Sequence, residues 1–296
     1  MGARLTRFIQ SIREILDTFD VAVLDQWGVL HNGSVPYPHA AEAITLLHEY
    51  GKPIIILSNS GKRAGINRKR IADMGLPAEY FSAVVTSGEA LRDDILSSRL
   101  KINGKTPRMI LPICGKPGDA EAWRGDSAEI EFVHSCEGRA DCIMLMGLPD
   151  GSKADIHDDT FDKAVALNIP LICSNPDKTS PRAGGLVISP GALAERYATM
   201  GGQVVWYGKP YQPVFQAAMR CQPAITPSRF LMVGDSLEHD IAGAQQAGFS
   251  TAWVRGGIHA DAFDGSQGEN QLASLTNDLA KQKNTQPPDF SLYHFA

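Results

Sequence analysis

The chain has 296 residues, of which 43% are hydrophobic and 21% charged, and its formal net charge is −5 at pH 7. This length is typical of about two globular domains, and the hydrophobic content is ordinary for a water-soluble fold. The acidic balance argues against a nucleic-acid partner or a membrane partner, because nucleic acids and anionic membrane surfaces favour a basic patch.

The N-terminal residues 1–20 are expected to form an amphipathic helix, with apolar side chains spaced from Leu5 to Leu16. They lack the apolar stretch of a signal peptide, and no later window has about 18 uninterrupted apolar residues. The five cysteines are odd in number and include no C-x-x-C pair, so neither a disulfide framework nor a zinc site is indicated. We therefore expect a cytoplasmic protein.

Short apolar runs alternate with segments of helical periodicity along the whole chain. Strands buried on both faces and separated by helices indicate βαβ units around a parallel sheet. The predicted strands are 21–24, 53–57, 83–85, 109–113, 142–146, 171–173, 204–207, 230–233 and 251–254. Helical spacing is predicted at 39–50, 88–96, 159–167, 212–220 and 237–247.

Polar residues at the ends of predicted strands indicate where a ligand would bind, because ligands of an open parallel sheet bind beyond the carboxyl ends of its strands. These residues form one group in the N-terminal third and a second group in the C-terminal third, and the segment between has its own strand and helix signals. We therefore predict a core domain from residues 1–88 and 200–270, with an inserted α/β domain at 89–199. The polar residues 271–296 are expected to be a surface segment or loose tail.

Acidic residues follow two of the predicted strands. Asp25 comes directly after the apolar run 21–24, where a lone acid also fits a loop cap. Asp235 follows Gly234, and Asp240 opens the next predicted helix. Paired acids at a strand-to-helix turn suit an oxygen-preferring cation such as Mg²⁺, although Asp240 alone also fits an acid favoured by the helix dipole.

Anion-binding residues follow two further strands. Ser58 and Asn59 lie just before Gly61, and such a turn can hold a phosphoryl oxygen through side chains and backbone N–H groups. The same residues could instead cap the following helix. Lys209 follows the run 204–207, where a lysine supplies positive charge to a bound anion or is simply a solvated surface group.

In order, spacing and strand context, these segments resemble motifs I to IV of the haloacid-dehalogenase superfamily, and in detail they resemble its class IIA branch, the NagD-like phosphatases. The resemblance implies a Rossmann-like parallel-sheet core with an inserted α/β cap of the C2 type. It covers about residues 20–265, and the matching segments are Asp25-x-x-Gly-Val-Leu-x-x-Gly33, Ser58-Asn-Ser, Gly208-Lys-Pro-x-x-x-x-Phe215 and Gly234-Asp-Ser-x-x-x-Asp240-Ile-x-Gly-Ala.

The resemblance implies a nucleophile and a metal site. Asp25 is expected to attack phosphorus and form an aspartyl-phosphate that water then cleaves. Mg²⁺ is expected to bind the Asp25 carboxylate, the backbone carbonyl of Trp27 and Asp235, with Asp240 in support directly or through water.

The resemblance also implies how a small phosphorylated substrate is held. Ser58 and Asn59 would hold phosphoryl oxygens, and Lys209 would balance the charge between Asp25 and the transferred group.

The segment Ser174-Asn175-Pro176-Asp177 resembles the substrate-facing loop of the inserted cap in this branch. Asn175, Pro176 and Asp177 are therefore candidates for substrate contacts, and Arg182 is a further candidate for contact with an anion. Without the resemblance, Asn-Pro-Asp indicates a turn. A homodimer through the cap is expected from the resemblance alone.

Trp27 departs from the phosphatase pattern, in which motif I reads Asp-x-Asp and the second Asp protonates the leaving oxygen. An indole N–H does not exchange a proton near neutral pH, and losing general acid catalysis typically costs about 10²–10⁴-fold in rate. We therefore expect weak activity on alkyl phosphates and a smaller loss on aryl or acyl phosphates. His31 could act as a replacement acid, or it could be a histidine in the turn with no catalytic part.

Two other classes of function remain open. The first is a phosphate-ligand binding or regulatory protein that keeps the site and has lost turnover, which Trp27 suggests. The second is C–halogen or C–P cleavage at Asp25. The Asp235 and Asp240 pair argues against dehalogenation, which usually runs without Mg²⁺, and no pattern marks the cap lysine that C–P cleavage would need.

Overall fold

The computed structural model describes residues 5–138, 140–182, 185–263 and 268–296, with no side-chain description at 181–182. It divides the chain into two compact units. Unit 1 comprises Met1–Ser58, Gly65–Val85 and Lys209–Ala296, and unit 2 comprises Asn59–Ala64 and Thr86–Gly208.

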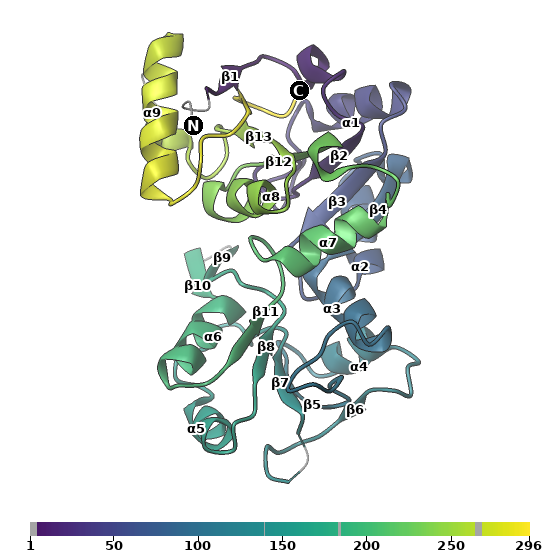
Figure 1. The fold of residues 1–296 in the computed structure, drawn as a ribbon, viewed down its shortest axis with the longest axis vertical. Helices are drawn as coiled ribbons and strands as arrows, with labels where there is room; N and C mark the ends of the chain where they lie inside the picture. The colour runs from purple at the N-terminus through teal and green to yellow at the C-terminus, as the bar shows by residue number, and fades with distance from the viewer. Residues whose placement is uncertain (1–4, 139, 183–184, 264–267) are drawn as a thin grey trace. The chain divides into compact units, whose positions relative to one another are not determined.

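Unit 1 is built on a seven-stranded sheet with the order β1-β14-β13-β12-β2-β3-β4 (Figure 1). The residues of β2 (Val21–Leu24), β3 (Ile54–Ser58) and β12 (Phe230–Gly234) are all buried. Continuous aliphatic runs of this kind are typical of parallel strands covered on both faces. The pairings β12–β2 and β2–β3 are indeed parallel, so the predicted parallel-sheet α/β fold is confirmed.

Helices connect the strands of this sheet, as the alternating pattern of the sequence predicts. The other strands are β1 (Arg7–Phe8), β4 (Phe81–Thr86), β13 (Ser250–Val254) and β14 (Phe290–Leu292). The α-helices are α1 (Ala40–Glu49), α2 (Ala64–Asp73), α7 (Gln212–Arg220), α8 (Ala242–Gln246) and α9 (Glu269–Gln282). Short helices are η1 (Ile12–Ile15), η2 (Ala78–Tyr80), η3 (Pro227–Arg229), the π-helix η4 (Leu237–Ile241) and η5 (Ala260–Phe263).

Both ends of the chain differ from the sequence-based expectation. The described part of the expected N-terminal helix forms β1 and η1 instead. The expected tail forms α9, drawn in yellow in Figure 1, and β14, which pairs in parallel with β1 and β13. The loose-tail alternative is wrong, because apolar residues of α9, separated by polar ones, pack on a buried cluster of Leu237, Ile241, Trp253 and Phe263.

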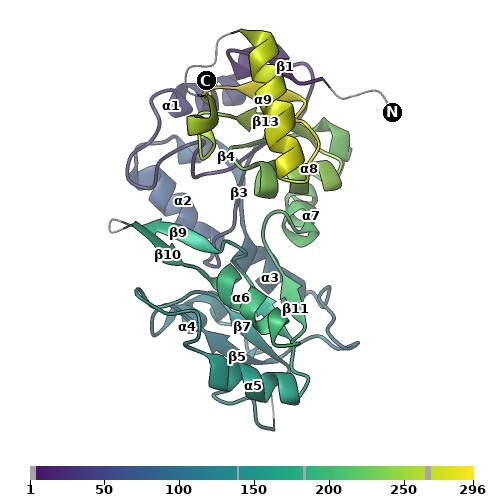
Figure 2. The same ribbon diagram turned by 90° about the vertical axis from the view of Figure 1, so that its left-hand side faces the viewer.

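Unit 2 contains a five-stranded parallel sheet with the order β11-β8-β7-β5-β6, and a separate antiparallel hairpin of β9 and β10. Figure 2 shows the hairpin beside α6, which β9 contacts. The strands are β5 (Met109–Ile113), β6 (Glu131–Phe132), β7 (Cys142–Leu145), β8 (Leu171–Cys173), β9 (Thr179–Arg182), β10 (Gly185–Ile188) and β11 (Val204–Trp206). The helices are α3 (Ser87–Leu96), α4 (Asp119–Arg124), α5 (Asp158–Ala166) and α6 (Pro190–Thr199).

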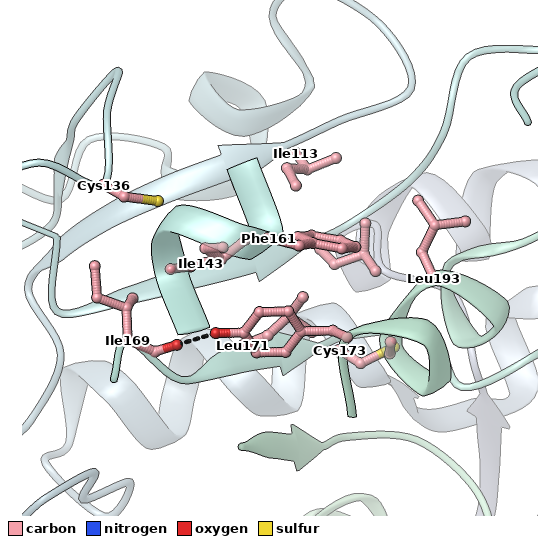
Figure 3. Close-up of a cluster of buried hydrophobic side chains, with 12 residues drawn as sticks. Ile113, Cys136, Ile143, Phe161, Ile169, Leu171, Cys173 and Leu193 are labelled. Atoms are coloured by element: carbon pink, nitrogen blue, oxygen red, sulfur yellow. Dashed lines mark hydrogen bonds between the residues drawn. The ribbon is translucent and has the colours of Figure 1, made fainter. Parts of the chain in front are cut away.

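The core of unit 2 lies between its sheet and the helices α5 and α6 (Figure 3). Ile143 and Leu171 contribute to it from neighbouring strands, and Phe161 contributes from α5. Phe161 meets Tyr197 of α6 edge to face, with ring centroids 5.1 Å apart. The Tyr197 hydroxyl donates a hydrogen bond to the Ile169 carbonyl, so the buried phenol has a partner, as such groups require.

The second crossing between the units lies further along the chain than residue 199, where the sequence suggested it. The strand β11 pairs with β8 of unit 2, so the chain leaves unit 2 between Gly208 and Lys209. Lys209 is thus the first residue of the last segment of unit 1. In the part of the chain that the structure describes, no helix is long and apolar enough to cross a membrane.

Candidate active site

Three polar side chains of unit 1 lie at the ends of neighbouring strands of one sheet. β2 and β12 pair with Leu24 opposite Val233, and the Asp25 backbone N–H donates to the Val233 carbonyl at 2.9 Å. Asp235 comes directly after β12, and Ser58 is the last residue of β3 on the other side of β2. Because parallel strands end at the same edge of a sheet, Asp25, Asp235 and Ser58 share the ligand-binding edge.

Asp25, Asp235 and Asp240 form a buried cluster in which one oxygen of each carboxylate lies within 4.8 Å of the others. Their exposed fractions are 9%, 3% and 1%. Asp240 is brought back to the strand end by η4, and its Oδ2 accepts the Ser236 backbone N–H at 3.0 Å. Asp235 Oδ2 accepts the Ile258 backbone N–H at 2.9 Å.

Two glycines allow the carboxylates to approach so closely. A Cβ atom at Gly28, whose φ is +77°, would lie 1.8 Å from Asp235 Oδ2. A Cβ atom at Gly234 would lie 2.3 Å from Asp240 Cγ. Both distances are far inside van der Waals contact, so the glycines of these two motifs are required by the packing around the cluster.

Lys209 lies between two members of the cluster. Its Nζ is 2.5 Å from Asp25 Oδ1 and 2.7 Å from Asp240 Oδ1, and the residue is 3% exposed. Burial by itself lowers the pKa of Lys209, but the Asp240 and Asp25 carboxylates outweigh burial and raise it above its usual value. The site therefore holds an ammonium charge against Asp25 and Asp240. The anion-binding role of Lys209 stays a prediction.

The cluster has more negative charge than Lys209 balances. Burial is the main cause that raises the pKa of Asp25 above its usual range, and Asp240 adds to the effect against the lowering influence of Lys209. Burial, then Asp25 and Asp240, raise the pKa of Asp235 in the same direction. Desolvation and repulsion between like charges thus favour protonated carboxyl groups, unless a cation binds.

These residues fit a hard divalent cation. The three donors are carboxylate oxygens, which Mg²⁺ prefers, and a cation would take the place of the protons that the raised pKa values favour. Asp25, Asp235 and Asp240 are the residues that would hold it. The part assigned to the Trp27 carbonyl stays a prediction.

The surroundings of His31 argue against a general-acid role for this residue. Its side chain is fully buried, and its Nδ1 accepts the Gly33 backbone N–H at 3.0 Å. Burial and the nearby Arg70 charge lower the pKa of His31 to about 4, so the imidazole is neutral at pH 7 and has no acidic proton to give. The arrangement favours the alternative, a histidine that shapes the turn after β2.

The remaining predicted residues lie in unit 2. Asn59 is separated from its neighbour Ser58 by the unit boundary, and its Nδ2 donates to Asp177 Oδ1 at 2.8 Å. The Asp177 backbone N–H donates to Asn175 Oδ1 at 3.0 Å, and Pro176 between them is buried. The side chain of the further anion candidate at position 182 lies outside the described part of the chain. Asp177 therefore orients Asn59, a role that the turn signal did not suggest.

Sequence reasoning missed the groups that hold Asp235 in place. Besides the Ile258 N–H, the Trp253 indole N–H donates to the Asp235 backbone carbonyl at 2.9 Å. A Cβ atom at Gly257 would lie 2.3 Å from Asp235 Cβ. The glycine pair at 256–257, one residue beyond the strand 251–254, is a signal for this close approach. Nothing in the sequence indicates this contact of Trp253, because a tryptophan in an apolar strand is expected to be a core residue.

Buried carboxylates beside a lysine at the carboxyl edge of a parallel sheet form a candidate α/β enzyme site. Two family models match the chain around this site: haloacid dehalogenase-like hydrolase at residues 22–121 and HAD-hydrolase-like at residues 206–281. The chain belongs to the haloacid dehalogenase-like hydrolases, in the class IIA branch that includes NagD.

Relatives over most of the chain agree with this assignment. Rat (Rattus norvegicus) chronophin is 27% identical over 84% of this chain and 80% of its own. The ribonucleotide monophosphatase NagD of Escherichia coli is 25% identical over 81% of this chain and 89% of its own. The crystal structure of a haloacid dehalogenase-like hydrolase from Brucella suis is 27% identical with a TM-score of 0.75, and the match covers 97% of this chain and 100% of that one. The chain is therefore a hydrolase of a family with phosphatase members.

Proposed function

We propose that this hydrolase is a Mg²⁺-dependent phosphohydrolase acting on a small phosphorylated metabolite through an aspartyl-phosphate at Asp25. The observation that carries the proposal is the buried cluster of Asp25, Asp235 and Asp240, with Lys209 Nζ 2.5 Å from Asp25 Oδ1. The NagD relative, named a ribonucleotide monophosphatase, supports a phosphate monoester as the class of substrate.

In this mechanism a carboxylate oxygen of Asp25 forms a bond to phosphorus while the bond to the leaving oxygen breaks. The leaving group takes the electron pair, and water later cleaves the phosphorus–oxygen bond to Asp25. Lys209 orients Asp25 and offsets the charge of the phosphoryl group, and the Ser58 hydroxyl donates to a phosphoryl oxygen. Mg²⁺, when bound, supplies the remaining positive charge.

The leaving group must depart without a proton from the protein. Trp27 stands where the family pattern has an acid, and His31 is neutral at pH 7 because its pKa is lowered to about 4. Aryl and acyl phosphates have leaving groups that are stable as anions. Alkyl phosphates do not, so their turnover loses the roughly 10²–10⁴-fold that a general acid supplies.

Unit 2 is proposed to be the cap that selects the substrate. It is inserted between segments of unit 1 and has a sheet and core of its own. Its loop Asn175, Pro176 and Asp177 would face the substrate, and the bond from Asn59 Nδ2 to Asp177 Oδ1 would present the Asn59 amide to the phosphate.

Release of inorganic phosphate tests the proposal, with Mg²⁺ and a panel of aryl, acyl, sugar and nucleotide phosphates. We expect the wild type to hydrolyse aryl or acyl phosphates and Asp25→Asn to be inactive. Trp27→Asp should gain at least about 10-fold on sugar phosphates, because it restores an acid at the position of the general acid. Equal phosphate release by wild type and Asp25→Asn would contradict the proposal.

A second function, phosphate-ligand binding without turnover, is favoured by the same absence of an acidic proton at Trp27 and His31. The panel separates the two functions. If wild type and Asp25→Asn are both inert while the wild type binds phosphate with Mg²⁺, the chain is a binding protein on a phosphatase fold. Sustained multiple turnover would exclude this alternative.

A further inference from the structure

Trp27 is an exposed aromatic residue close to the nucleophile. It follows Asp25 by two positions, so the two Cα atoms are at most about 7 Å apart. Its exposed fraction is 37%, although it follows a strand whose residues are all buried. Trp27 is therefore a partly exposed aromatic side chain two positions from the proposed nucleophile.

The indole is held in one orientation by its neighbours. Trp27 lies so tightly over Gly33 that a Cβ atom there would be 2.1 Å from the indole Cη2. The His31 ring meets the indole edge to face at a centroid distance of 5.5 Å. The Arg70 guanidinium of α2 lies 5.3 Å from the centroid of the Trp27 ring, a cation–π distance. A ring fixed on several sides is preorganised to stack on a second ring without further loss of conformational freedom.

We infer that Trp27 is a specificity-determining residue whose indole stacks on an aromatic leaving group, so the preferred substrates are aryl phosphate monoesters. The inference rests on the proposed function and narrows its substrate class. Two properties of one residue agree on this class. The position lacks an acid, which favours a leaving group stable as an anion. Its side chain is an indole in a residue that is 37% exposed, and contact with an aromatic side chain favours a planar ring over an acyl chain.

Equilibrium binding of two non-hydrolysable probes tests the subsite without requiring turnover. The dissociation constants of phenylphosphonate and methylphosphonate are measured by calorimetry in the presence of Mg²⁺. We expect the wild type to prefer phenylphosphonate. In Trp27→Leu this preference should fall roughly 3- to 10-fold, the size of one aromatic pair. Trp27→Phe, which keeps a ring, should retain most of it.

A matched pair of glycine variants tests whether the orientation of the indole matters. Gly33→Ala forces the indole to move, whereas Gly51→Ala introduces a side chain at another positive φ with nothing within 4 Å. We expect Gly33→Ala to weaken the preference for phenylphosphonate and Gly51→Ala to leave it unchanged. If Gly33→Ala does not fold, the Trp27 variants still decide the question.

The outcomes separate the inference from the proposed function. The same preference in wild type and Trp27→Leu overturns the stacking subsite, whether or not the protein hydrolyses phosphate esters. A lost preference in Trp27→Leu supports the subsite even if the turnover panel is inert. In that case the proposed hydrolysis fails, and the subsite serves a binding protein for aryl phosphates.

Discussion

Lys209 illustrates how one residue controls the charge of the site. A buried ammonium is tolerated only when it is paired, and removing one partner of a buried ion pair leaves an uncompensated charge. The carboxylates of Asp25 and Asp240 raise the pKa of Lys209 above its usual value, so the lysine stays charged throughout the pH range in which a protein is normally studied. The carboxyl groups whose pKa values are raised toward neutral pH are those of Asp25 and Asp235.

We predict that Lys209→Met lowers the free energy of unfolding at pH 8 by about 3–5 kcal/mol. At pH 5 the loss should be smaller, because Asp25 and Asp235 are then largely protonated and need less compensation. Urea unfolding at the two pH values measures the difference. Lys281→Met on the exposed surface of α9 is the control, expected to change stability by less than about 0.5 kcal/mol. An equal loss at both pH values would show that Lys209 does not compensate these carboxylates.

At the scale of elements, the C-terminal segment supports the site through its packing on Trp253. The helix α9 packs on the cluster that contains Trp253, and the Trp253 indole N–H holds the backbone of Asp235. The strand β14 completes the sheet between β13 and β1. The position of the Asp235 carboxylate therefore depends on residues far along the chain that take no part in the chemistry.

This arrangement predicts that Leu292→Ala in β14 is strongly destabilising. Leu292 is fully buried, so its truncation should cost about 2–5 kcal/mol of unfolding free energy. The matched change Leu5→Ala, at a residue that is 83% exposed, should cost less than about 0.5 kcal/mol. Denaturant unfolding compares the two variants. Equal, small losses would mean that residues 290–292 behave as a tail in solution.

At the scale of the whole molecule, the carboxylate cluster links metal binding, protonation and folding. The pKa values of Asp25 and Asp235 are raised in the folded protein above the ordinary value of about 3.9. The folded state therefore binds more protons than the unfolded state between these values, and metal-free stability falls as the pH rises through the folded pKa values. A cation that replaces the protons should bind better as the pH rises.

We predict that Mg²⁺ raises the thermal unfolding temperature, and more at pH 8 than at pH 5.5. At a concentration about 100 times its dissociation constant, the gain is about 2.7 kcal/mol. Differential scanning calorimetry with and without a chelator measures the gain, and NaCl of matched ionic strength controls for screening. Asp235→Asn should stabilise the metal-free protein at pH 8 and abolish most of the Mg²⁺ effect. A Mg²⁺ effect that persists in Asp235→Asn would place the cation elsewhere.

Local patterns in the sequence predicted the α/β class, most strands of both sheets and the four motifs that contain the candidate site residues. These features are local: an aliphatic run predicts its own strand, and β2, β5 and β8 have the predicted bounds. The acids that end the strands could be expected to meet, because parallel strands end at a common edge. The sequence around His31 did not distinguish a catalytic role from a structural one.

Features that depend on residues distant in sequence became visible only in the folded chain. Lys209 contacts Asp25 across 184 positions, and the Asn59 amide finds Asp177 across 118. Contacts between distant residues also place β11 beside β8 and β14 beside β13. They likewise lower the pKa of His31, through its burial and the charge of Arg70. Periodicity records which face of an element is buried, but not which other element covers it. Partners, burial and therefore charge states are settled only when the chain packs.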